Sequence, residues 1–345
     1  MTAPIMARVA LLGASGYAGL EFLRLARRHP GITITALASR EWAGQPASCL
    51  APGFDTGRGE ASQFPAIISL EAIADLLGRG TCDTLVSALP HGALAGLVAG
   101  NPAWIEAPTR ILDLSADWRD ESMGFVYGLT EKNRARLHLT PRVANPGCYP
   151  TAATLALLPA VEAGWVTGAV MVSALSGVTG AGRRAVLSNS FAELAGSASF
   201  YKVGEIHSHV SEMTRNFASY GANTTPSVAF APQLVPMSRG ILATVSTPLS
   251  QPIHETLARE RYIERYADES FVTVLPAGEW PDTRAVHGTN QVQVAVTTVH
   301  CGRTLLATAA IDNLVKGAAG QAIQNLNLMT GWPEATGLDL EARAW

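Results

Sequence analysis

Residues 7–38 decide the fold; they read ARVALLGASGYAGLEFLRLARRHPGITITALA. The run ARVALL is short, mostly apolar and followed by glycine, as in a buried parallel strand. Residues 20–28 place apolar side chains three apart, which predicts a helix, and ITITALA at 32–38 predicts a second strand. A strand, a glycine turn, a helix and a strand within about 30 residues form a β-α-β unit. The chain is therefore expected to begin with a doubly wound, Rossmann-type α/β domain with a parallel sheet.

The same alternation continues downstream. Residues 70–77 predict a helix, and the runs at 83–88 and 110–114 predict two further buried strands. The segment 42–64 is rich in glycine, proline and small residues and has no period, so it is predicted to be an excursion on the surface. A turn at 145–148 leads into a predicted helix at 151–163.

Beyond that helix the pattern changes. Residues 169–175, 241–246 and 289–299 predict longer strands, the last with a clear period of two, and 312–327 predicts a closing helix. These elements predict an α+β catalytic or dimerisation domain with a mixed or antiparallel sheet. The expected division is a dinucleotide-binding domain at 1–147, completed by a C-terminal helix at 311–330, and a catalytic domain at 148–310.

Composition excludes several classes of protein. The formal net charge of −3 leaves no basic footprint for nucleic acid or for an acidic membrane surface. No apolar run reaches the roughly 20 residues of a membrane span. The four cysteines include no CxxC pair and no zinc-finger spacing with histidine. A cytoplasmic protein with free thiols and no bound metal is expected.

The segment GASGYAG at 13–19 joins the first strand to the first helix. Glycines let the backbone approach a ligand closely, and the helix N-terminus offers amide donors and a positive dipole end to an anion. In this context the loop predicts a pyrophosphate site, although a plain tight turn would show the same pattern.

The second strand ends in Ser39-Arg40. NAD-binding sites usually place an acidic residue here for the ribose 2′-hydroxyl. A hydroxyl and a guanidinium suit a 2′-phosphate instead, which predicts NADP. Glu41 follows directly and weakens this argument, and Arg40 could also be a solvated surface charge.

Cys148 follows Asn145-Pro146-Gly147 at the start of a predicted helix. The positive end of the helix dipole favours a thiolate, and the Pro-Gly turn can aim the sulfur outward. Asn145 can donate a hydrogen bond to an oxyanion. The alternative is a buried structural cysteine, which is how we interpret the other three.

A catalytic thiolate needs a proton partner. His207 and His209 lie in EIHSHVSEM, and this is the best candidate segment. Two histidines two residues apart could bind a metal, but no third ligand is evident.

The glycine-rich segment SGVTGAGR at 176–183 follows a strand. Such a loop can cradle an anion or pass beneath a nicotinamide, and it could also be a simple connection. Arg119 and Arg183 are candidates for gripping phosphate because guanidinium groups bind it bidentately, with a structural ion pair as the alternative.

The motifs, taken in order, resemble the N-acetyl-γ-glutamyl-phosphate reductases of arginine biosynthesis over nearly the whole chain. The matching segments are GASGYAG (13–19), PHG (90–92), DLSADWR (113–119), VYGL (126–129), ANPGCYPT (144–151), SGVTGAGR (176–183), the His-x-His segment, PMSRG (236–240) and KGAAGQAIQN (316–325).

The resemblance implies an NADPH-dependent oxidoreductase in which Cys148 is the nucleophile and forms a thioester. It places the catalytic histidine of the family's HRHxPE segment on His209 and the end of that segment on Glu212. Beside the catalytic pair, the residues predicted to contact the acyl phosphate are Arg119, Asn145, Arg183, His207 and Glu212. The residues predicted to contact the cofactor are Gly13, Ser15, Gly16, Tyr17, Gly19, Ser39, Arg40, Pro90, Ser176, Gly177, Gly180 and Asn313. The family suggests a homodimer or homotetramer.

The chain departs from the family pattern at four positions, namely Thr130, Ser208, Ser211 and Gln233. Ser208 stands where the family usually has arginine, which leaves open how the substrate carboxylate is held. Related readings are a lysine-pathway reductase acting on a carrier-linked acyl phosphate and an aspartate-semialdehyde-type dehydrogenase. A catalytically silent NADPH-binding regulator on the same fold is the alternative from another class.

Overall fold

A computed structural model describes residues 3–54, 64–184, 186–221 and 225–342. The chain divides into two compact units, Met1–Pro146 with Ala318–Asp339, and Gly147–Gly317 with Leu340–Trp345. Within the described residues, no helix combines the length and the apolar character that a membrane span requires.

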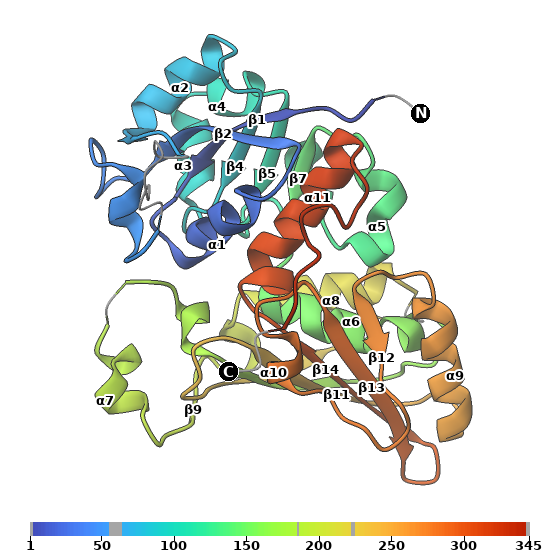
Figure 1. Ribbon diagram of the computed structural model, residues 1–345. Coiled ribbons are helices and arrows are strands. Elements are labelled where there is room, and N and C mark those ends of the chain that lie inside the picture. The colour runs from blue at the N-terminus through green and yellow to red at the C-terminus, as the bar shows by residue number, and fades with distance from the viewer. Residues whose placement is uncertain (1–2, 55–63, 185, 222–224, 343–345) are drawn as a thin grey trace. The chain divides into compact units, whose positions relative to one another are not determined.

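The first unit is built on a parallel sheet of seven strands in the order β3-β2-β1-β4-β5-β7-β6 (Figure 1). The strands are β1 (Ala7–Leu12), β2 (Ile32–Ala38), β3 (Ile67–Ile68), β4 (Thr84–Ser87), β5 (Arg110–Asp113), β6 (Val126–Tyr127) and β7 (Arg142–Ala144). The helices are α1 (Tyr17–Ala26), α2 (Leu70–Gly78), α3 (Ala93–Gly100), α4 (Ala103–Glu106), α5 (Thr130–Leu137) and α11 (Gly320–Thr330). This confirms the predicted doubly wound fold.

Apolar side chains pack against this sheet. Ile73 of α2, Leu94 of α3 and Trp104 of α4 share one buried cluster with Leu12 and Leu85 of the strands. Helix α11 packs beside α1 and α5. Strand β1 lies between β2 and β4, so the strand order reverses beside its carboxyl end. Ligands of open α/β sheets bind at such a switch point.

The second unit contains a mixed sheet of seven strands in the order β12-β13-β14-β11-β8-β10-β9. The strands are β8 (Val170–Ser176), β9 (Ser199–Phe200), β10 (Val228–Leu234), β11 (Ile241–Pro248), β12 (Val272–Val274), β13 (Val292–Val299) and β14 (Thr304–Ile311). The helices are α6 (Cys148–Glu162), α7 (Phe191–Leu194), α8 (His209–Ser219), α9 (Glu255–Tyr266) and α10 (Thr283–Val286). The predicted mixed sheet is confirmed.

Helix α6 is the core of the second unit. It packs on β11, β13 and β14 and against α8 and α9. Every residue from Tyr149 to Val161 is buried, which explains why this helix shows no amphipathic pattern in the sequence. The first residue of the helix, Cys148, is partly exposed.

Two predicted segments differ in detail from the structure. The predicted closing helix at 311–330 begins later, because Ile311 ends β14; a π-helical turn covers Val315–Ala319 and leads directly into α11 at Gly320. The predicted surface excursion at 42–64 contains a 3₁₀ helix, Ala47–Leu50, whose two end residues are buried. Residues 55–63 of that segment lie outside the described residues.

Candidate active site

The glycine loop has the geometry that its sequence predicts. Gly13 has a φ of +76°, and a Cβ there would lie 2.5 Å from the carbonyl oxygen of Ala88. A Cβ on Gly19 would lie 2.3 Å from the carbonyl oxygen of Gly13. Gly16 precedes α1 and provides no side-chain cap. Only glycine fits this turn, and a helix N-terminus without a side-chain cap suits the pyrophosphate of a dinucleotide.

The end of β2 lies beside this loop. The hydroxyl groups of Ser15 and Ser39 are 3.0 Å apart and hydrogen-bonded. Ser39 is buried, whereas Arg40 and Glu41 are exposed. The hydrogen bond between Ser15 and Ser39 therefore joins the glycine loop to the end of β2, where a ribose is expected. Arg40 follows Ser39 and is exposed to solvent. Binding of a 2′-phosphate by Arg40 stays a prediction.

The PHG and DLSADWR motifs are joined by hydrogen bonds. The Asp117 carboxylate accepts from Gly92 N at 2.6 Å and from Ala95 N at 3.1 Å, so it caps the start of α3. His91 Nδ1 accepts from Ala116 N at 2.9 Å. These bonds fix the turn after β4, where Pro90 is exposed.

Asp113 begins the DLSADWR motif and is fully buried. Its carboxylate accepts a hydrogen bond of 2.5 Å from the Ser115 hydroxyl. Burial raises the pKa of Asp113 to about 6, although the bond from Ser115 opposes the shift. The Asp113 carboxyl therefore changes its protonation state at a higher pH than an ordinary aspartate does.

Arg119 and Asn145 are tied into the first unit. Arg119 is buried, and its guanidinium donates to the backbone carbonyls of Asn145 and Leu114, both at 2.9 Å. The Asn145 amide donates to Ala318 O at 3.2 Å and accepts from Asn325 Nδ2 at 3.0 Å. Both side chains hold the chain immediately before the Cys148 turn. For Arg119 this favours the structural alternative over phosphate binding.

Cys148 opens α6, as predicted. The turn before it is held by Glu212, which is 2% exposed and whose carboxylate accepts from Gly147 N at 2.9 Å. Gly317 of the π-helical turn lies against Cys148, because a Cβ on Gly317 would be 2.8 Å from the Cβ of Cys148. Only a glycine leaves room for the cysteine here, and π-helical turns often mark functional sites.

The two histidines of the predicted segment come together. Their ring centroids are 4.7 Å apart, and His207 Nδ1 accepts from the backbone N–H of His209 at 3.1 Å. The ring of Tyr149, the residue after Cys148, lies 5.9 Å from each of them. Each histidine is 8% exposed. The structure thus brings the cysteine's neighbour and both histidines into one cluster.

Tyr149 and Tyr201 complete this cluster. Their hydroxyl oxygens are 2.7 Å apart. Burial raises the pKa of Tyr149, and it raises the pKa of Tyr201 to about 12. Both phenols therefore stay protonated near neutral pH. Tyr201 was not predicted as a site residue, since nothing in its sequence context distinguishes it.

The loop at 176–182 is anchored at its start. The Ser176 side chain is buried, and its hydroxyl donates to Gly177 O at 3.0 Å. A Cβ on Gly177 would lie 2.7 Å from Arg239 N. Gly180 and Arg183 are exposed, so the distal part of the loop remains accessible to a ligand.

Asn313 connects this loop to the start of β11. Its amide oxygen accepts from Gly240 N at 2.8 Å, and its amide nitrogen donates to Thr179 Oγ1 at 3.0 Å. These bonds give Asn313 a clear role in holding the loop. Its predicted contact with the cofactor stays a prediction.

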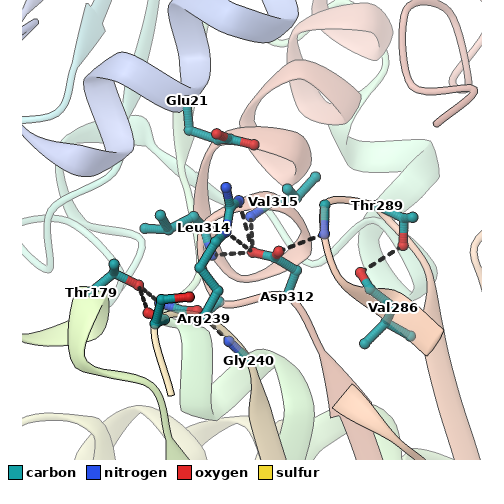
Figure 2. Close-up of polar contacts among 12 residues, drawn as sticks. Glu21, Thr179, Arg239, Gly240, Val286, Thr289, Asp312, Leu314 and Val315 are labelled. Atoms are coloured by element: carbon teal, nitrogen blue, oxygen red, sulfur yellow. Dashed lines mark hydrogen bonds and ion pairs between the residues drawn. The ribbon is translucent and has the colours of Figure 1, made fainter. Parts of the chain in front are cut away.

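Asp312 gathers three segments of the second unit and is fully buried. Its carboxylate accepts from Leu314 N at 2.8 Å, from Val315 N at 3.1 Å, from Gly288 N at 2.7 Å and from Arg239 Nη2 at 3.0 Å. Figure 2 shows the Arg239 side chain reaching this carboxylate. Asp312 was missed by the sequence reasoning, which identified PMSRG as a motif but gave Arg239 no role.

Metal binding finds no further support. Among the described residues, no group of three or more His, Cys, Asp or Glu side chains is arranged to hold a metal ion.

Two family models match the chain. The model described as "Semialdehyde dehydrogenase, NAD binding domain" matches residues 8–140, and "Semialdehyde dehydrogenase, dimerisation domain" matches residues 148–313. Among curated proteins, the N-acetyl-gamma-glutamyl-phosphate reductase of Laribacter hongkongensis is 39% identical over 97% of this chain and 98% of that protein. The protein of the same name from Geobacter sulfurreducens is 37% identical, again over 97% of this chain and 98% of that protein.

Solved structures of lower identity share the fold. Aspartate semialdehyde dehydrogenase II from Vibrio cholerae has a TM-score of 0.74 at 18% identity, over 94% of this chain and 98% of that one. The aspartate semialdehyde dehydrogenase of Candida albicans, solved with NADP, has a TM-score of 0.67 at 17% identity, with the same two coverages.

Proposed function

The chain belongs to the N-acetyl-γ-glutamyl-phosphate reductase family, and on this basis we propose that it reduces N-acetyl-γ-glutamyl phosphate with NADPH, through a thioester on Cys148. The products are N-acetylglutamate 5-semialdehyde and inorganic phosphate, which places the reaction in arginine biosynthesis. One observation carries the proposed mechanism: Cys148 opens α6, and the ring of its neighbour Tyr149 contacts both buried histidines.

The first unit fits a dinucleotide. Gly13 and Gly19 leave no room for side chains, so the backbone can approach the pyrophosphate at the N-terminus of α1. The Ser15–Ser39 bond holds the loop at the strand end where a ribose would lie. NADPH, when bound, supplies the hydride that reduces the acyl group. Arg40, exposed beside Ser39, is proposed to bind the 2′-phosphate.

Cys148 forms the covalent bond. Its sulfur lies at the N-terminus of α6, where the helix dipole favours the thiolate. The thiolate attacks the acyl carbon of the acyl phosphate, the sulfur–carbon bond forms, and the carbon–oxygen bond to phosphate breaks. The phosphate group leaves with the electron pair of that bond, and the thioester remains on the enzyme.

A histidine then provides the proton. After reduction of the thioester carbonyl, the oxygen carries a negative charge and needs a proton. The Nδ1 atom of His207 is occupied by the backbone N–H of His209, which suits a positioning role for His207. We therefore assign the proton donor to His209. The proton on that oxygen then returns to His209, the carbon–oxygen double bond forms and the sulfur–carbon bond breaks, which releases the aldehyde and restores the Cys148 thiolate.

The substrate phosphate requires a cation. Arg183 is exposed at the end of the loop 176–182, whereas Arg119 is buried and donates to two backbone carbonyls. Of the two predicted arginines, Arg183 is therefore the better candidate for the phosphate. Glu212 is proposed to position the Cys148 turn, since its carboxylate accepts a hydrogen bond from Gly147 N. We do not assign it a direct contact with the substrate.

A homo-oligomer in the cytoplasm completes the proposal. The family description of residues 148–313 as a dimerisation domain supports self-association, and four free cysteines suit a reducing compartment.

An assay with purified protein tests the reaction. NADPH oxidation is followed with N-acetyl-γ-glutamyl phosphate and, separately, with aspartyl phosphate; we expect turnover with the first substrate and little with the second. Cys148→Ala should abolish turnover while NADPH still quenches or shifts the protein fluorescence. Wild-type turnover by Cys148→Ala would refute the thioester, and preference for aspartyl phosphate would refute the substrate.

The reverse reaction separates a phosphorylating from a hydrolytic enzyme. Oxidation of N-acetylglutamate semialdehyde with NADP⁺ should depend on added phosphate and saturate with it, because phosphate is the group that accepts the acyl chain. Arsenate should replace phosphate. Steady turnover in buffer without either anion would show that water resolves the thioester and would contradict the proposal.

A further inference from the structure

The turn between β4 and α3 contains the PHG motif and has no role in the mechanism proposed above. It lies directly beside the glycine loop, because a Cβ on Gly13 would be 2.5 Å from the carbonyl oxygen of Ala88 and 3.2 Å from Leu89 N. The N–H of Ala88 also donates to the carbonyl oxygen of Leu12, the last residue of β1, at 3.0 Å. The turn at 88–92 and the glycine loop therefore lie side by side at the carboxyl ends of β1 and β4, where the strand order reverses.

The Asp117 segment holds this turn in place. The Asp117 carboxylate accepts from Gly92 N at 2.6 Å and from Ala95 N at 3.1 Å, and His91 Nδ1 accepts from Ala116 N at 2.9 Å. Gly92 has a φ of +78° and no side chain to limit its conformation. The bond from Gly92 N therefore restrains the position of the turn that has the greatest conformational freedom.

Asp117 is itself fixed on both sides. Before it, the buried Ser115 hydroxyl accepts from Asp117 N at 3.1 Å and donates to the carboxylate of Asp113 at 2.5 Å. After it, the buried ring of Trp118 stacks on Phe125, with the ring centroids 4.7 Å apart. A chain of hydrogen bonds that begins at Asp113, at the end of β5, therefore ends at the turn after β4.

The charge of Asp117 distinguishes two helix N-termini. Helices α1 and α3 follow the neighbouring strands β1 and β4 (Figure 1). Gly16 precedes α1 and has no side chain to cap it, whereas the Asp117 carboxylate occupies the N-terminus of α3. A phosphate at α3 would meet a negative charge and would find two of the helix N–H groups already bonded. The pyrophosphate is therefore directed to α1, and the turn 88–92 is left to a part of the cofactor without phosphate.

The strand order indicates which part this is. In sheets of this kind the ribose next to adenine lies at the end of the second strand, here beside Ser39, and β4 lies on the opposite side of β1 from β2. A dinucleotide with its pyrophosphate at α1 therefore has its nicotinamide half toward the turn after β4. We propose that Asp117 is a positioning residue for the nicotinamide half of NADPH, because it fixes the turn 88–92 that receives this half. The inference rests on the NADPH dependence proposed above and assigns a role to a residue that does not itself contact the cofactor.

Calorimetric titration with two ligands, without acyl phosphate, tests the inference. One ligand is NADPH, and the other is adenosine 2′,5′-bisphosphate, which lacks the nicotinamide half. Asp117→Ala should raise the Kd for NADPH by roughly 3- to 30-fold, the range expected for loss of a helix cap, and should leave the Kd for adenosine 2′,5′-bisphosphate unchanged. Asn101→Ala is the matched control, since Asn101 accepts from Ala103 N at 3.0 Å at the opposite end of α3. The control should bind both ligands as the wild type does.

Two further variants test whether the chain of hydrogen bonds acts through Asp117. Ser115→Ala should weaken NADPH binding by itself and add nothing to the effect of Asp117→Ala, because residues that act through one group are not additive. Asp117→Asn keeps one acceptor oxygen and should have a smaller effect than Asp117→Ala. Circular dichroism checks the fold of each variant, and if Asp117→Ala does not fold, Asp117→Asn decides by the same comparison of ligands.

The comparison of the two ligands separates positioning from general damage. Weaker binding of NADPH alone, with an unchanged control, supports the inference. An unchanged Kd for NADPH overturns it, and so does an equal loss of affinity for both ligands. Binding is measured without acyl phosphate, so a wild type that binds NADPH but does not reduce the acyl phosphate would refute the proposed reaction and leave this result standing.

Discussion

A methyl group at residue 317 tests whether the π-helical turn positions Cys148, the proposed nucleophile. An ideal Cβ on Gly317 would lie 2.8 Å from the Cβ of Cys148 and 3.3 Å from the Cδ1 of Ile311. Carbon atoms in contact prefer separations of about 3.5–4.0 Å, so Cys148 or the turn must move by about 0.7–1.2 Å in Gly317→Ala. Ile311 is fully buried in β14 and offers little space for the turn to retreat.

A displacement of this size should be visible in both rate and stability. Overpacking of a buried site costs about 1–3 kcal/mol, and a misplacement of about 1 Å in an active site can lower the rate by roughly 100-fold. We therefore expect kcat to fall by roughly 10- to 100-fold in Gly317→Ala. The KM for NADPH should stay near its wild-type value, because the glycine loop at 13–19 belongs to the first unit.

The position of the sulfur can be followed directly. Alkylation of Cys148 by iodoacetamide, measured by peptide mass mapping, should proceed at a changed rate, with the exposed Cys301 as an internal reference. Gly96→Ala is the matched control, since Gly96 lies inside α3 and a Cβ there meets no atom within 4 Å. It should retain wild-type turnover. A Gly317→Ala enzyme with wild-type kcat and wild-type alkylation of Cys148 would refute the positioning argument.

Three further predictions concern proton transfer, cofactor choice and pH. His209→Asn should lower kcat by roughly 10²–10⁴ as the loss of a general acid, and His207→Asn should lower it less; the reverse order in steady-state kinetics would exchange the two roles. Arg40→Asp should reduce the ratio of kcat/KM for NADPH to that for NADH, and an unchanged ratio would leave Arg40 as a surface charge. The pKa of Asp113 is about 6 in the folded protein and about 3.9 in an unfolded chain, so its contribution to stability is complete below pH 4 and is lost as the pH rises to 6. Urea unfolding should show a loss of about 2 kcal/mol between pH 4 and pH 6, which Asp113→Asn should remove; an identical pH profile for the variant would contradict the assignment.

The first unit was predictable because its signals are local. The run at 7–12, the glycines at 13–19 and the strand at 32–38 each carry a clear pattern, and all three agree with the structure. Strands β3 and β6 have two residues each, too few for any period to show. The position of Cys148 at the start of α6 was predictable because a Pro-Gly turn before a helix is visible in the sequence, and the close histidine pair was predictable because the two residues are two apart.

The start of the closing helix could not be predicted, because a side chain there competes for the backbone N–H groups. Residues 312–327 have the composition of a helix, but the Asp312 carboxylate accepts from Leu314 N and Val315 N. Such side-chain-to-backbone bonds replace helical ones, and here they delay the α-helix until Gly320. The Asp312 carboxylate also accepts hydrogen bonds from Arg239 and Gly288, which are distant in the sequence. No local pattern encodes such partners.

Helix α8 connects the two proposed catalytic residues, the nucleophile Cys148 and the proton donor His209. His209 is the first residue of α8, and Glu212 lies three residues later, on the same side of the helix. The Glu212 carboxylate holds Gly147 N directly before Cys148, and the His209 ring contacts Tyr149 directly after it. Helix α8 therefore contacts the start of α6 at the residues directly before and directly after Cys148. A third contact joins the two helices further along, where Asn216 of α8 donates to Thr154 of α6 at 3.1 Å. The spacing HxxE in the sequence is thus about one helical turn, and it places the proposed proton donor and the carboxylate that holds the Cys148 turn on one side of α8.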